Sequence, residues 1–309
     1  MEQLSSDVQE IPAQLSAGPV APQPQASSAV QPVSPQSCST CGTTPSAASN
    51  VVLPPSWIYA IGHIEPRFPS LSLEKEFAQA TGRGDTAGLT DRQALHAVLS
   101  KPESRYLVRQ ICWVMTIEGM DTYILRPKDA ADYSLLVDAI RANPTPLDLD
   151  VVIGARVGIA TPDMCNGLMV PIVVFDQVYS FDRTALVKAI PKPDKVTVKD
   201  FAPAAEELFD RLMQLADNAG ATDEHRALNY LAMRYQAVYS KASECFAQNC
   251  SLTGVNVQLS PLSGTRKILE VIFTFTNRTT DVDEQYFVRV DVTDEFPFLV
   301  TKLSPYYNR

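Results

Sequence analysis

The sequence predicts an α+β protein with a tail at its N-terminus. Three observations support this. Apolar residues recur at steps of three and four in the third quarter of the chain, they recur at every second residue after Cys250, and the first 56 residues contain no aromatic side chain. We expect a disordered tail over 1–56, a mixed helix and strand part over 57–195, and a C-terminal part over 196–309.

The tail, residues 1–56, is rich in Pro, Ala, Ser and Gln and lacks any Lys or Arg. Its only charges are Glu2, Asp7 and Glu10. Such a segment buries too little apolar surface to offset the entropy of ordering it, so it reads as a tether. The whole chain has a formal net charge of −9, which argues against nucleic-acid binding.

The mixed part begins with a strand at 57–65, WIYAIGHIE, which is rich in β-branched and aromatic residues. Pro66 and Pro69 end it and predict a position near a sheet edge. Thr90 and Gln93 have the spacing of a capping box and predict the start of a helix. The other elements expected in this part are a helix over 72–81, strands over 111–117 and 121–126, a helix from Asp129 to about Arg141, and strands over 151–160 and 168–181.

The C-terminal part begins with a helical hairpin. Leu208, Leu212 and Leu215 lie on one stripe of the first helix. Thr222 is expected to cap the second helix, whose apolar seam continues to Cys245. The two helices are therefore predicted to pack antiparallel.

Strands follow the hairpin, because the apolar period changes to two. Val255 and Val257 alternate with polar residues, and so do Val288, Val290 and Val292. Turn-like residues separate these runs. An antiparallel meander with one solvated face is the predicted arrangement.

The chain opens with MEQLSSDVQEIP, which has neither the positive start nor the apolar run of a secretory signal, and no later segment has the length and apolar character of a membrane span. We therefore expect a cytoplasmic protein without a membrane partner. In that compartment the six cysteines are expected to be thiols. Cys112 and Cys245 read as core residues, and Cys165 as a thiol in an ordered loop.

Cys38 and Cys41 have the two-residue gap of a zinc-binding pair, and no other cofactor is indicated. Two ligands do not complete a tetrahedral site. The alternatives are distant ligands, a zinc ion shared between two copies of the chain, or an unliganded thiol pair.

The sequence contains no recognisable catalytic motif. His63, His96 and His225 read as structural or solvated side chains, and no GxSxG elbow accompanies them. The segment TGRGDTAG lacks the strand and the GK[ST] ending of a phosphate-binding loop, so it reads as a turn.

Several longer strings are more specific: IGHIEPRFP, EKEFAQATGR, MCNGLMVPIVVFDQVYSFD, AEELFDRLMQLADNAG and FPFLVTKLSPYY. Together they resemble the C-terminal domain of unknown function of the PatG and PatA proteins of cyanobactin biosynthesis, over about residues 57–309. That family belongs to a pathway that heterocyclises, cleaves and macrocyclises ribosomal peptides. The subtilisin-like Asp, His and Ser motifs of the PatG protease are missing from this chain, so no catalytic residue is carried over.

The resemblance implies a noncatalytic accessory or interaction module of cyanobactin biosynthesis. Its expected partners are the precursor peptide, the pathway enzymes or a second copy of the chain, and strand addition at the edge of 57–65 is one means of binding. The alternative is an undiscovered enzymatic role within a PatG-type protease and macrocyclase system. Its candidate residues are His63, Glu65, Arg67 and Cys165.

Overall fold

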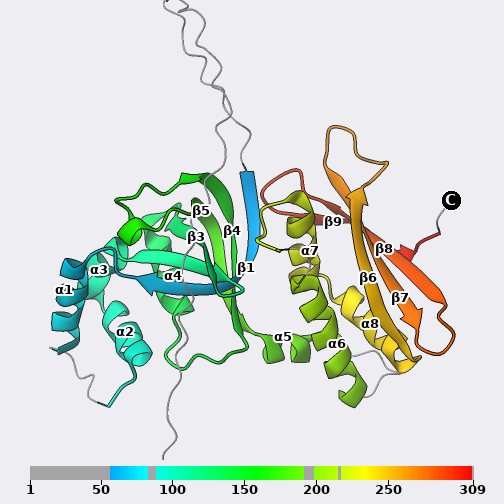
Figure 1. The fold of residues 1–309 in the computed structure, drawn as a ribbon, viewed down its shortest axis with the longest axis horizontal. Coiled ribbons are helices and arrows are strands. Elements are labelled where there is room, and N and C mark those ends of the chain that lie inside the picture. Colours follow the sequence, from blue (N-terminus) through cyan, green and yellow to red (C-terminus); the bar gives the residue numbers. More distant parts are fainter. Residues whose placement is uncertain (1–55, 83–87, 191–197, 215–216, 308–309) are drawn as a thin grey trace, which may run out of the picture. The chain divides into compact units, whose positions relative to one another are not determined.

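A computed structural model describes residues 56–82, 88–190, 198–214 and 217–307. Residues 1–55 of the predicted tail, with the Cys38–Cys41 pair, lie outside these ranges, and Ser56, which the prediction included in the tail, is the first residue of β1. Within them the chain mixes helices with two β-sheets, which confirms the α+β class (Figure 1).

The first sheet is a closed five-stranded barrel with the order β1-β2-β3-β5-β4. β3 and β5 are parallel, whereas the other neighbouring strands are antiparallel. Closure leaves no free edge on this sheet. The strands are β1 (Ser56–Arg67), β2 (Cys112–Ile117), β3 (Met120–Pro127), β4 (Asp148–Ile159) and β5 (Pro171–Asp182).

Short helices pack on the barrel and share its core (Figure 1). Trp113 and Phe175 from the strands and Leu107 and Leu136 from the helices are fully buried in one cluster. Thr90 and Gln93 form the predicted capping box. The helices are α1 (Leu71–Gly82), α2 (Asp91–Leu99), η1 (Pro102–Ser104), α3 (Arg105–Gln110), η2 (Ala130–Asp132), α4 (Tyr133–Ala139) and η3 (Cys165–Gly167).

The second sheet is an antiparallel meander with the order β6-β7-β8-β9. Val288, Val290 and Val292 are fully buried against helices, as their alternation predicts. The elements of this part are α5 (Arg183–Ala189), α6 (Val198–Met213), α7 (Asp223–Arg234), α8 (Gln236–Ala247), β6 (Cys250–Leu259), β7 (Ile268–Asn277), β8 (Asp283–Asp291) and β9 (Phe298–Pro305).

The long helix predicted after Thr222 is two helices in the structure, because the backbone of Tyr235 leaves the helical region at φ −116° and ψ 88°. In a continuous helix the carbonyl of Ala232 would accept from the backbone four residues later. Here it accepts the hydroxyl of Tyr239 at 2.6 Å instead. The side chain compensates for the lost backbone bond, and the apolar seam is divided between α7 and α8.

The helix predicted from Asp129 to Arg141 is also divided. Asp129 caps it as expected, since its side chain accepts from the backbone of Ala131. The first turn is the 3₁₀ helix η2, and α4 ends at Ala139. Arg141 adopts a positive φ of 46°, which is incompatible with the right-handed helix.

Candidate functional site

The two edges of the C-terminal sheet differ in how they are covered. At β9, the hydroxyl of Tyr230 accepts from the backbone N–H of Leu299 at 3.2 Å, and that of Tyr235 accepts from Leu303 at 2.8 Å. Side chains of α7 and of the break after it therefore occupy backbone donors of this edge strand. Such coverage is a means of preventing unwanted strand pairing.

The β6 edge lacks this protection. Among the residues that the structure describes, no strand pairs with its outer side. A bulge interrupts its register between Leu252 and Gly254, but the stretch Val255–Leu259 contains neither a charged residue nor proline. Asn256 and Gln258 are exposed in this stretch. It therefore offers unprotected backbone to an extended partner.

The prediction that residues 57–65 form a sheet edge is wrong. β1 pairs with β2 through His63–Arg67 and with β4 through Ser56–Gly62. Pro66 and Pro69 limit the length of the strand, and the barrel closes through it because β4 pairs with its first half and β2 with its second half. In the first half, the backbone N–H of Tyr59 donates to the carbonyl of Gly220 and its carbonyl accepts from Asn229, so an added strand would have to displace these contacts.

A polar cavity of about 230 Å³ contains two of the residues considered for catalysis, His63 and Glu65. Arg67 pairs with Glu65 at 3.1 Å and with Asp121 at 3.1 Å. The structure thus brings three of the four candidate enzymatic residues into one neighbourhood. The remaining lining is supplied by Arg92, Ala139, Arg141, Pro144, Thr145, Asp148 and Asp150.

Asp150 is a residue of this cavity that the sequence did not single out. It is 5% exposed, and its carboxylate accepts from the backbone of Ile64 at 2.8 Å and from the hydroxyl of Ser180. Burial raises the pKa of Asp150, while these hydrogen bonds and the charges of Arg141 and His63 oppose the rise. Its place on a strand of apolar residues was the available signal, because a buried acid needs partners.

Cys165 does not complete a catalytic group, because its sulfur forms a disulfide with Cys112. The expectation that these two residues are thiols is therefore wrong. They are 53 residues apart, and the barrel brings them together within a small apolar cluster. The disulfide could not be predicted from the sequence, because the two cysteines are far apart along the chain. Cys245 and Cys250 are free and buried, so Cys245 is a core residue as predicted.

The other two histidines lie on separate helices. His96 is half-buried on α2, and His225 is in the first turn of α7, where its Nδ1 is buried without a partner. Neither lines the polar cavity.

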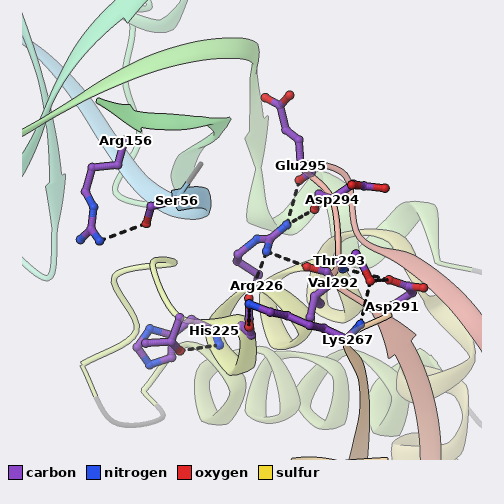
Figure 2. A network of polar contacts seen from close by, with 12 residues as sticks. Ser56, Arg156, His225, Arg226, Lys267, Asp291, Val292, Thr293, Asp294 and Glu295 are labelled. Carbon is purple, nitrogen blue, oxygen red and sulfur yellow. Dashed lines mark hydrogen bonds and ion pairs between the residues drawn. The ribbon is translucent and has the colours of Figure 1, made fainter. Parts of the chain in front are cut away.

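Arg226, which follows His225 in the sequence, is a buried cation that is only 2% exposed. Figure 2 shows its guanidinium directed at the segment after β8. The accepting groups are the backbone carbonyls of Val292, Asp294 and Glu295. Arg226 therefore fastens α7 to the β8–β9 connection.

Among residues 56–307, with the gaps given above, no group of three or more His, Cys, Asp or Glu side chains is arranged to hold a metal ion. No helix in the described part of the chain has both the length and the apolar character that a membrane crossing requires.

Comparison with known proteins identifies one family. Residues 195–306 match the family model described as "PatG C-terminal". A solved structure titled "PatG Domain of Unknown Function" superposes with a TM-score of 0.67 at 19% sequence identity, covering 81% of this chain and 98% of that one. No curated protein sequence matches the chain. Residues 195–306 therefore match the PatG C-terminal family, as the sequence resemblance predicts, and the solved structure shows that the described part of the chain shares that domain's fold.

Proposed function

We propose that this chain is a noncatalytic interaction module of cyanobactin biosynthesis that binds an extended peptide segment by strand addition at β6. The observation that carries the proposal is the contrast between the two edges of one sheet. Tyrosine hydroxyls accept hydrogen bonds from backbone N–H groups of β9, whereas no strand in the described part of the chain pairs with the outer side of β6. The PatG C-terminal match supports the pathway.

Strand addition suits a partner whose sequence varies, because main-chain hydrogen bonds provide much of the affinity. Val255 and Val257 pack partly against the core, while Asn256 and Gln258 face solvent. A bound strand would continue this alternation, with apolar residues on the helix side and polar residues on the other. The precursor peptide and an extended segment of a pathway enzyme are the partners considered.

The test is a calorimetric titration of the full chain with the precursor peptide and with each pathway enzyme. At least one saturable interaction is expected. An Asn256→Lys and Gln258→Lys double variant should weaken it at least tenfold, because charged side chains on an edge strand oppose pairing. The charge-matched control is Val157→Lys with Met169→Lys, since both side chains are exposed on the barrel part. Absence of binding across the set, or equal loss in the control, contradicts the proposal.

A second candidate function is enzymatic, and the cavity that holds His63, Glu65 and Asp150 favours it. A histidine beside a buried carboxylate with a raised pKa is a combination found in general acid–base sites. A reconstituted pathway with His63→Ala or Glu65→Gln tests this role. Unchanged product yield in both variants eliminates it, whereas loss of product with intact peptide binding supports it over the interaction role.

A further inference from the structure

Three cationic side chains line a second cavity, of about 550 Å³, on the helical side of the barrel. Lys101, Arg105 and Arg109 belong to its lining. No ion pair or side-chain hydrogen bond joins any of the three to another residue in the described ranges. Because the chain has a net charge of −9, three such cations around one cavity make a locally positive site on an otherwise acidic protein.

The floor of this cavity is apolar. Leu99, Val108 and Val137 are buried there, from α2, α3 and α4 respectively. Arg105 and Arg109 are exposed at the opening, while Lys101 is half-buried. The cavity therefore combines an apolar interior with a cationic rim, and its volume is in the range of small-ligand and peptide pockets.

The spacing of the cations indicates more than one anionic group. Arg105 and Arg109 are separated by four residues of α3, which corresponds to about 6 Å along the helix axis. In an extended peptide, residues two apart are separated by about 7 Å. Two carboxylates flanking one residue match this distance, whereas a phosphate group has no apolar part to fill the floor.

The opposite wall has a different chemistry. α4 contributes Ser134 and Asp138, both exposed, and Asp138 is the one acidic side chain in the lining. Its charge repels an anion from that side. Both side chains have oxygen atoms able to accept hydrogen bonds from peptide N–H groups. The anionic groups of a ligand are thus directed towards α3.

From these observations we propose that the cavity binds an acidic peptide segment in which two carboxylates flank an apolar side chain. The apolar side chain enters between Leu99, Val108 and Val137, and the two carboxylates, which point to the opposite side of an extended peptide, pair with Arg105 and Arg109 at the exposed rim. Lys101 adds a third positive charge. This site is separate from the β6 edge, since it is built entirely from residues 99–138, and it does not depend on the proposed function.

The experiment uses the full chain and a fluorescein-labelled peptide with the core Glu-Leu-Glu, measured by fluorescence anisotropy. The matched peptide Gln-Leu-Gln preserves size and lacks charge. We expect binding of the acidic peptide to be at least tenfold tighter, because charge-assisted hydrogen bonds to Arg are stronger than neutral ones. Rising salt should weaken it.

Arg105→Gln with Arg109→Gln should reduce the affinity at least tenfold, and the Arg105→Lys and Arg109→Lys pair should retain most of it. The charge-matched control is Arg278→Gln with Lys302→Gln, two cations outside the cavity lining. Equal binding of both peptides, equal loss in the control, or displacement of the acidic peptide by an equal concentration of inorganic phosphate overturns the proposal.

Discussion

At the scale of single residues, Gly220 shows how backbone geometry joins the barrel to the helices. It has a positive φ of 73°, and a Cβ at this position would lie 2.3 Å from the carbonyl oxygen of Tyr59. The backbone N–H of Tyr59 donates a hydrogen bond to the carbonyl of Gly220 at 2.9 Å. Asn229 of α7 donates to the carbonyl of Tyr59 at 2.7 Å. Only glycine permits this approach.

We predict that Gly220→Ala lowers the free energy of unfolding by about 3 kcal/mol, since it adds both strain and steric overlap. For a chain of this size the expected fall in Tm is about 6–10 °C. Differential scanning calorimetry measures it. The control is Gly158→Ala, where no atom lies within 4 Å of the added Cβ, and it should change stability by less than about 0.5 kcal/mol. Equal Tm values for the two variants contradict the assigned packing.

Glu295 predicts a pH dependence at the same scale. Burial and the neighbouring carboxylate of Asp176 raise the pKa of Glu295 to about 7, although Lys128 and Arg226 oppose the rise. Its Oε1 atom is buried without a hydrogen-bond partner. Hydrogen bonds from Lys128, at 2.7 Å, and from Glu295 lower the pKa of Asp176 despite the opposing effect of burial. Below about pH 7 the pair therefore holds a proton on Glu295.

Between pH 4.5 and about 7 the unfolded state loses this proton while the folded state keeps it, so stability falls as pH rises through this window. In Glu295→Gln the free energy of unfolding should decrease by about 1 kcal/mol less across this pH window than in the wild type. This figure allows for solvent screening of a half-exposed group. Urea denaturation at pH 4.5, 5.5, 7 and 8 measures it. The exposed Glu76→Gln serves as the control, and parallel stability curves for wild type and Glu295→Gln refute the assignment.

At the scale of elements, the disulfide between Cys112 and Cys165 ties β2 to η3. The turn at η3 is strained, because Cys165 and Asn166 both have positive φ angles, of 45° and 57°. A crosslink over 53 residues restricts the unfolded chain, and the loop-entropy estimate is about 4 kcal/mol. Reduction should therefore lower the stability of the folded protein substantially.

We predict that Cys112→Ser with Cys165→Ser lowers the free energy of unfolding by about 2–4 kcal/mol and makes Tm insensitive to dithiothreitol. Wild-type Tm should fall on reduction. Counting free thiols under denaturing conditions checks the bond itself. Cys245→Ser is a control that should leave the reductant effect in place, since Cys245 is free. A wild-type Tm that is unchanged by reductant contradicts a stabilising crosslink.

Elements with local signals could be predicted from the sequence. Thr90 and Gln93 predict the N-terminal cap of α2, and Thr222 predicts the cap of α7. Such caps can be predicted because the capping side chain is close in sequence to the backbone N–H groups that it binds. The break at Tyr235 could not be predicted, since the apolar seam continues through it and the compensating bond comes from Tyr239. Short helices such as α3 and α5 could not be predicted, because six or seven residues are too few to show the helical period of apolar residues.

The candidate sites required long-range information. His63, Glu65 and Arg67 are close in the sequence and stay close in the structure, but Asp150 reaches them only through barrel pairing of β1 with β4. Arg226 and its acceptors are more than 60 residues apart, so its charged sequence context suggested solvent instead of burial. Local periodicity predicts which face of an element is buried and leaves its partner undetermined.

At the scale of the whole molecule, the two sheets differ in how they protect their edge strands from unwanted pairing. The barrel has no edge because it closes, and the meander has its β9 edge covered by tyrosine hydroxyls. β6 is the exception in the described part of the chain. In the proposed function it is the surface where an extended partner completes the sheet.

Hydrogen exchange of backbone amides, followed by mass spectrometry with and without the precursor peptide, tests this claim most directly. Strand addition places new hydrogen bonds on the outer side of β6. We expect slower exchange at Val255–Leu259 on binding, with little change at β1 or β9. Peptide binding that leaves the exchange of Val255–Leu259 unchanged, or that protects β9 instead, would contradict strand addition at β6.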